Sequence, residues 1–260
     1  MVFLVLGFAV MSPALAAHEL KILYAFCAQS GCPDGYGPTP GLVKDHAGNL
    51  FGSVYVGAAN KYGGVFELQR LSKDQYTYKL LYSFCGIPPC AYGPLGAMVL
   101  DTSGNLYGVL ANYGLHYSGE VFELLAPTSG GGWTFKDLYD FCPQKGCPDG
   151  GSPESASLTY AGAISGELYD GVSPLFGTAA AGGNPTDDPG VVYELQPGTD
   201  GNWTEHAIYK FCSQSNCSDG VDPIGPVIED GVGNLFGTTY RGGKCYQGCG
   251  TVFELSPSAG

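Results

Sequence analysis

The sequence predicts an all-β fold, a β-propeller with four blades of four antiparallel strands each. Three observations predict it. A phrase of three elements recurs four times along the 260 residues. Each copy contains four short runs rich in aromatic and β-branched residues and bounded by Gly, Asp and Asn. The two ends of the chain also fall at complementary points of the repeat.

The repeated phrase begins with Gly-Asn-Leu-(Phe/Tyr)-Gly, continues with Val-(Phe/Tyr)-Glu-Leu and ends with (Leu/Ile)-Tyr-x-Phe-Cys. Residues that every copy shares are expected to build the scaffold, so function is to be sought where the copies differ. The first element lies at 48–52, 104–108, 173–177 and 233–237, the second at 65–68, 121–124, 192–195 and 252–255, and the third at 23–27, 81–85, 138–142 and 208–212.

In the first copy we expect strands at 41–45, 49–54, 64–68 and 76–84. The turn between the first two, Asp45 to Asn49, places Asp where its carboxylate accepts bonds from the backbone, and Gly48 where a positive φ is needed. Each such turn holds one Asp, whereas a calcium loop needs several oxygens at alternate positions. The turns are therefore interpreted as structural.

The termini predict a closed ring. Residues 18–26 resemble a fourth strand without a blade, and residues 250–255 resemble a third strand without a fourth. Pairing the two would complete the last blade and remove the open sheet edges. Residues 18–260 then form one domain, expected to be monomeric. The alternative is an open twisted stack of sheets that needs more copies or a partner.

The bulk composition excludes some classes of function. The chain has only 11 Lys and Arg residues and a net charge of −13. Binding to phosphates needs clustered basic residues, so nucleic acid is excluded as a partner. Residues 1–17 are apolar and end in small residues, which predicts a signal peptide and a secreted or periplasmic protein. No later stretch is apolar enough to span a membrane.

The ten cysteines fall into five short-range couples, four of them with four residues between the partners. In an exported chain an even count predicts disulfides. Zinc is the alternative that spacing alone leaves open, but no His accompanies the couples and they lie on different repeats, so no metal site and no cofactor are expected. The predicted disulfides are Cys27–Cys32, Cys85–Cys90, Cys142–Cys147, Cys212–Cys217 and Cys245–Cys249.

The repeated residues resemble the GloVer tandem-repeat family of secreted bacterial proteins, whose motif is built around the same Gly-Asn-Leu-(Phe/Tyr)-Gly, Val-(Phe/Tyr)-Glu-Leu and Leu-Tyr-x-Phe elements. The resemblance covers nearly all of residues 18–257. The fourth copy, 234–239 and 250–255, matches best, and the third departs most, with Ser173-Pro174 in place of Gly-Asn. The resemblance implies export and a repeat β fold, and it implies no defined reaction.

Function is expected on the face of the propeller that carries both the cysteine loops and the Gly-Gly loops, because long and variable loops on a rigid scaffold are where binding usually occurs. Exposed tyrosines there can stack on sugars or anchor a protein, or else pack over the disulfide loops. The residues that differ between copies form the predicted ligand site: Tyr113, His116, Tyr117, Arg241, Lys244 and Tyr246.

The sequence contains no motif of a nucleophile, a phosphate loop or a dinucleotide site. We therefore expect a secreted binding module for an extracellular glycan or protein rather than an enzyme. One alternative is a polysaccharide hydrolase or lyase that uses carboxylates near a central pocket. The repeated glutamates could supply such carboxylates, but we interpret them mainly as hydrogen-bond partners within the blades. They are Glu67, Glu123, Glu194 and Glu254. The other alternative is a structural surface protein without a ligand.

Overall fold

The computed structural model describes residues 19–84, 93–111, 114–153, 157–184, 188–244 and 249–257, which form four antiparallel β-sheets. The first contains β1 (Tyr36–Pro38), β2 (Val43–Lys44), β3 (Leu50–Val56), β4 (Gly64–Ser72) and β5 (Gln75–Ser83). The second contains β6 (Val99–Leu100), β7 (Leu106–Leu110), β8 (Glu120–Leu125) and β9 (Thr134–Asp140). The third contains β10 (Leu175–Ala179), β11 (Val191–Pro197) and β12 (Trp203–Lys210), and the fourth β13 (Ile228–Glu229), β14 (Leu235–Thr239) and β15 (Thr251–Leu255).

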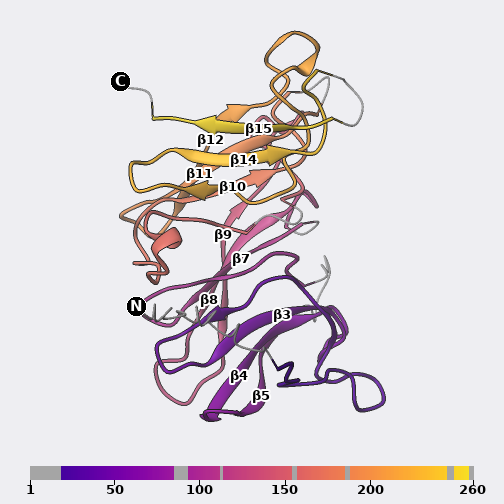
Figure 1. The fold of residues 1–260 in the computed structure, drawn as a ribbon, viewed down its shortest axis with the longest axis vertical. Coiled ribbons are helices and arrows are strands. Elements are labelled where there is room, and N and C mark those ends of the chain that lie inside the picture. The colour runs from indigo at the N-terminus through magenta and orange to yellow at the C-terminus, as the bar shows by residue number, and fades with distance from the viewer. Residues whose placement is uncertain are drawn as a thin grey trace, which may run out of the picture.

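The sheets follow one another along the long axis of the molecule, from the first sheet at the bottom of Figure 1 to the fourth at the top. The all-β prediction is confirmed: the described residues contain no α-helix, only the short 3₁₀ turns η1 (Ala163–Ser165) and η2 (Ser215–Cys217). The third repeat is longer than the others, and its additional residues include η1.

The tight turns have the chemistry that the sequence predicts. The Asp45 carboxylate accepts the Asn49 backbone N–H at 2.8 Å and the Asn49 side-chain amide at 2.8 Å. Asn49 in turn accepts the backbone N–H of Arg70 at 2.9 Å, which ties the turn to β4. Gly48 has a φ of 88°, a conformation in which a Cβ is strained. Asp101 and Asp230 bond Asn105 and Asn234 in the same way.

The hydrophobic core lies between successive sheets. Three valines occupy equivalent positions in the Val-(Phe/Tyr)-Glu-Leu strands: Val65 in β4, Val121 in β8 and Val192 in β11. Each lies at a β-bulge and is fully buried. Each packs into a cluster shared with the following sheet. We call these contacts junctions and number each by the later of its two sheets, so that the second, third and fourth junctions join sheets one to two, two to three and three to four.

The Tyr-x-Phe segments connect the sheets. The Phe of each segment packs against an aromatic ring in the third strand of the following sheet, so that every copy of the phrase repeats the same contact. The ring-centroid distances are 5.1 Å for Phe26–Phe66, 5.5 Å for Phe84–Phe122, 5.0 Å for Phe141–Tyr193 and 5.1 Å for Phe211–Phe253.

The described residues do not show the ring closure predicted from the termini. Residues 19–26 form no strand and lie against the first sheet, where Tyr24 stacks on Tyr78 with the ring centroids 4.7 Å apart. Within the described part of the chain, β15 pairs with β14 alone. The first sheet and β15 lie at opposite ends of the molecule (Figure 1). The arrangement corresponds to the alternative expectation, an open stack.

Three of the predicted disulfides are present, Cys27–Cys32, Cys142–Cys147 and Cys212–Cys217. The couple Cys85/Cys90 lies outside the described residues, as does Cys245, whose predicted partner Cys249 is disulfide-bonded. Every cysteine of the three described pairs has a positive φ. Each bridge therefore holds a tight loop in a conformation that an L-residue rarely adopts.

Candidate functional site

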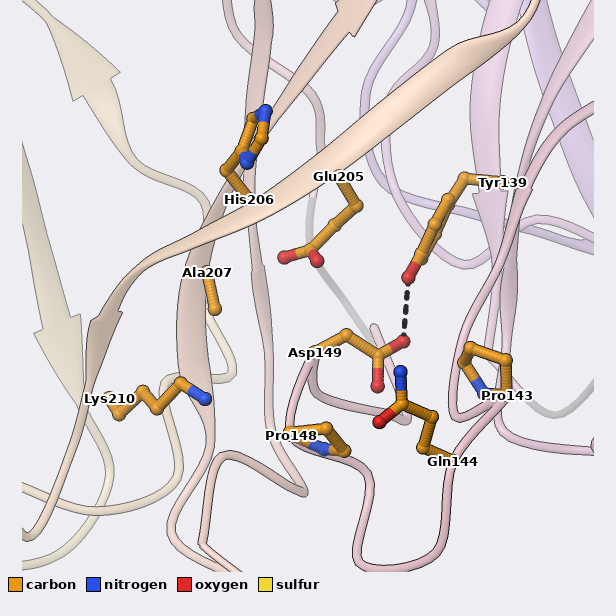
Figure 2. Close-up of a pocket in the computed structure, with 9 residues that line it drawn as sticks. All are labelled: Tyr139, Pro143, Gln144, Pro148, Asp149, Glu205, His206, Ala207 and Lys210. Carbon is orange, nitrogen blue, oxygen red and sulfur yellow. Dashed lines mark hydrogen bonds between the residues drawn. The ribbon is translucent and has the colours of Figure 1, made fainter.

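A pocket of about 350 Å³ opens at the third junction, between the loop after β9 and strand β12. Tyr139, Glu205 and Asp149 turn their polar ends toward one another there (Figure 2). Gln144 lies beside Asp149, while the His206 ring points away from the carboxyl groups. The residues that line the pocket are Tyr139, Pro143, Gln144, Pro148, Asp149, Glu205, His206, Ala207 and Lys210.

The cysteine loop positions Asp149. Its Oδ2 accepts the Tyr139 hydroxyl at 2.8 Å and the Cys142 backbone N–H at 2.8 Å, so the carboxylate that follows the Cys142–Cys147 loop is bonded to the residues at which that loop begins. The first and fourth cysteine loops repeat this arrangement. Tyr24 and Tyr209 donate to Asp34 and Asp219, each at 2.8 Å.

Glu205 is the residue that makes this junction different. The strand registers place it opposite Leu195, as Tyr78 lies opposite Leu68 and Phe135 opposite Leu124. In the first two sheets an aromatic ring therefore stands where the third has a carboxyl group. Phe135 stacks on Tyr82 and Phe122 with centroid distances of 5.8 and 5.5 Å. A glutamate does not fill that volume, and the pocket lies where the ring would be.

The carboxyl groups of this pocket are electrostatically coupled. The pKa of Glu205 is raised to about 8, first by burial and then by the charge of Asp149, against an opposing effect of the Lys210 ammonium. Burial and the hydrogen bond to Asp149 also raise the pKa of Tyr139. The raised pKa favours the protonated form of Glu205 at neutral pH.

Two buried oxygens of the pocket, Asp149 Oδ1 and Glu205 Oε1, have no hydrogen-bond partner within the described residues. Leaving a buried polar atom unpaired costs about 1–3 kcal/mol, so both oxygens can accept or share a hydrogen bond with a polar ligand or with water. In the described part of the chain, no three His, Cys, Asp or Glu side chains come together as metal ligands would. The pocket thus offers acceptors, a carboxylic acid and an amide to an uncharged polar molecule.

The residues predicted as the ligand site do not line this pocket. Tyr113 and Tyr246 lie outside the described residues. His116 and Tyr117 are exposed on the loop after β7, and Arg241 and Lys244 are exposed on the loop after β14. Arg241 forms an ion pair with Asp222. The two loops belong to the second and fourth sheets, and no pocket joins them within the described residues.

The repeated glutamates belong to individual sheets. Glu123 accepts the Tyr107 hydroxyl at 2.9 Å and lies 3.5 Å from the Lys136 ammonium, which confirms a bond within the sheet for this copy. A separate carboxyl, Glu120, has a pKa raised to about 9 by burial and by Asp137 and Asp140, but it lines none of the pockets.

No protein-family model and no curated protein matches the chain. None of the described residues forms a helix of the length and apolar character that crossing a membrane requires. The disulfides indicate an oxidising compartment. The pocket at the third junction is therefore assigned a function from its own chemistry.

Proposed function

We propose that the protein is a secreted binding module for an extracellular glycan and that the pocket at the third junction is its sugar site. The observation that supports this most directly is the replacement of an aromatic ring by Glu205, which places its unpaired, buried Oε1 in a pocket beside the unpaired Oδ1 of Asp149. Sugar hydroxyls both donate and accept hydrogen bonds, so they can pair with these oxygens without introducing charge.

The size and lining of the pocket agree with a small part of a glycan. Its volume of about 350 Å³ is at the lower end for ligand pockets, which suits one or two sugar rings rather than the surface of a protein partner. Pro143 and Pro148 add apolar surface beside the polar groups, and the Tyr139 ring adds an aromatic wall. Such mixed linings suit the alternating apolar and polar faces of a sugar.

The family resemblance and the export expectation are part of the proposal. The repeat motif supports membership of the GloVer tandem-repeat family, and residues 1–17 support removal of a signal peptide during export. If the four sheets closed into the four-bladed propeller that the sequence predicts, the pocket would remain beside the cysteine loop that follows β9.

A glycan array followed by calorimetry tests the proposal. We expect the purified protein to bind a defined set of glycans, and Glu205→Ala to weaken binding at least about tenfold, because the ligand loses its buried partner. Tyr139→Phe, which keeps the ring, should weaken binding less.

The matched control is the double variant His116→Ala, Tyr117→Ala, which alters an exposed loop outside the pocket. Its affinity should equal that of the wild type. If this control loses binding while Glu205→Ala keeps it, the site lies on the loops predicted from the sequence and the pocket proposal is wrong.

A second candidate function is glycoside hydrolysis, and one observation favours it. A protonated carboxylic acid beside a carboxylate is the pair that glycosidases use, and the raised pKa of Glu205 favours its protonated form beside Asp149 at neutral pH. Release of reducing sugar from the bound glycan would identify an enzyme. Glu205→Gln should then abolish turnover and retain binding, whereas a pure binding module releases no sugar with either protein.

A further inference from the structure

The outer face of the fourth sheet lacks the cover that the same face has in the other sheets. Val252 is 83% exposed, whereas the equivalent valines Val65, Val121 and Val192 are 0% exposed. Ile228 is 54% exposed, whereas its equivalent in the second sheet, Val99, is 4% exposed. In the first three sheets a following sheet covers this face.

The fourth sheet also lacks a strand. In the first three sheets the strand that contains the Val-(Phe/Tyr)-Glu-Leu element pairs with the strand that follows it, as β11 pairs with β12, whereas β15 pairs with β14 alone within the described residues. Two pockets, of about 680 and 480 Å³, lie along β15 and share Glu254 and Leu255. The smaller one contains Tyr209 and Phe211, the rings against which a fourth strand would pack.

One segment of the chain has the pattern of the missing strand. Tyr24 and Phe26 pack on the first sheet as Tyr82 and Phe84 pack on the second. Leu20 and Ile22 are 87% and 70% exposed. Within the described residues, the backbone of residues 20–26 forms no hydrogen bond to another strand. Its edge is therefore free to pair while its rings stay on the first sheet.

Register and charge specify how this segment would fit β15. The bulge valine lies opposite the Tyr of the fourth strand in the other sheets, as in Val65 opposite Tyr82, so Val252 would lie opposite Tyr24. The repeat glutamate then faces the residue three positions before that Tyr. In the complete sheets this partner is basic: Lys79, Lys136 and His206 face Glu67, Glu123 and Glu194. At β15 the pair would be Glu254 and Lys21.

In the same register Leu20 would lie opposite Leu255. Tyr78 and Phe135 occupy this position in the first and second sheets. Their rings pack against the Phe of the preceding Tyr-x-Phe segment. The Leu20 side chain would therefore enter the pocket that contains Tyr209 and Phe211.

The two complementary surfaces lie at opposite ends of the molecule (Figure 1), so the segment of the same chain does not reach β15 in this structure. We propose that β15 and the outer face of the fourth sheet bind residues 20–26 and the first sheet of a second copy of this chain. The contact between copies then has the geometry of the internal junctions, and the association is head to tail, which produces rings or filaments.

Analytical ultracentrifugation of two single variants and their mixture tests the proposal. Val252→Asp places a charge on the exposed acceptor face, and Ile22→Pro blocks strand pairing by the exposed segment. We expect the wild type to form dimers and larger species with rising concentration and each variant to remain monomeric. An equimolar mixture should form a dimer and stop there, because one intact β15 meets one intact segment and the other two ends are blocked.

Hydrogen exchange of the backbone amides of residues 251–255 distinguishes the results that would overturn the proposal. A wild type that stays monomeric, with the β15 amides on the edge away from β14 unprotected, overturns the proposal. A monomeric wild type with protected amides, whose protection each variant loses and mixing does not restore, also overturns it and assigns the segment to a closed ring within one chain.

Discussion

At the scale of single residues, Glu205 determines the character of the third junction. It occupies the position of Tyr78 and Phe135, and the exchange of a ring for a carboxyl group creates a pocket and a raised pKa together. The same burial that raises the pKa makes the ionised form costly to the folded state. Protonation of the Glu205 carboxyl therefore affects both the stability of the folded protein and the hydrogen bonds that the pocket can offer to a ligand.

This link predicts that the protein loses stability as the pH rises. The pKa of Glu205 is about 8 in the folded protein, compared with about 4.5 for an ordinary solvent-exposed glutamate, so the folded state holds the proton more tightly. The contribution is complete below pH 4.5 and is lost as the pH rises toward 8. Between pH 5 and 8 we expect the free energy of unfolding to fall by roughly 1 kcal/mol, allowing for partial exposure of the carboxyl.

Urea unfolding at several pH values measures this dependence. Glu205→Gln keeps the shape without the titration, so its stability should fall less over the same range, and Glu167→Gln, at an exposed carboxyl outside both proposed sites, should behave as the wild type. Glu120, with a pKa near 9, contributes a remaining slope of the same sign. Identical slopes for Glu205→Gln and the wild type would contradict the assignment.

A second prediction concerns the volume of the pocket. Glu205→Phe restores the ring that the second sheet has at Phe135, where it stacks between Tyr82 and Phe122. We expect a gain of about 1 kcal/mol in unfolding free energy from the added ring contacts, and loss of glycan binding because the pocket is filled. Thermal unfolding and calorimetry measure the two effects. A variant that binds normally would show that the ligand lies elsewhere.

At the scale of elements, the cysteine loops hold the carboxylates that bond the Tyr of each Tyr-x-Phe segment. Asp149 follows Cys147 by two residues and bonds both Tyr139 and the backbone of Cys142. The disulfide therefore fixes one wall of the pocket as well as the loop. Asp34 has the same place in the first loop, where no pocket of this kind is present among those of the described residues.

Removal of individual disulfides separates these two roles. Replacing Cys142 and Cys147 by Ser should lower the unfolding free energy by about 2 kcal/mol, the loop-closure value for so short a loop, and should also weaken glycan binding. The same change at Cys27 and Cys32 should cost similar stability and leave binding unchanged. Non-reducing peptide mapping should also recover all five predicted pairs. A cross-repeat link or a free thiol would contradict the pairing.

At the scale of the whole molecule, the all-β fold, the turn chemistry and the local disulfides were predictable because each depends on residues close in sequence. Ring closure was not, since it depends on the angles between successive sheets, and no single motif encodes a sum of small rotations. The pocket beside Glu205 was not predicted, for a related reason. Glu205 aligns with Tyr78 and Phe135 in the repeat, but the junction that makes this exchange a pocket is formed by two different sheets.

The equivalence of these three positions has an evolutionary consequence. In an array of like junctions, a ligand site that depends on one residue can arise, disappear or shift to a neighbouring junction by a single codon change, with the backbone unaltered. The copies that retain a ring at this position preserve stability while another copy varies. Duplication of the repeat therefore supplies spare positions for new specificity, and sequence divergence among the copies at this one position would indicate which junction binds.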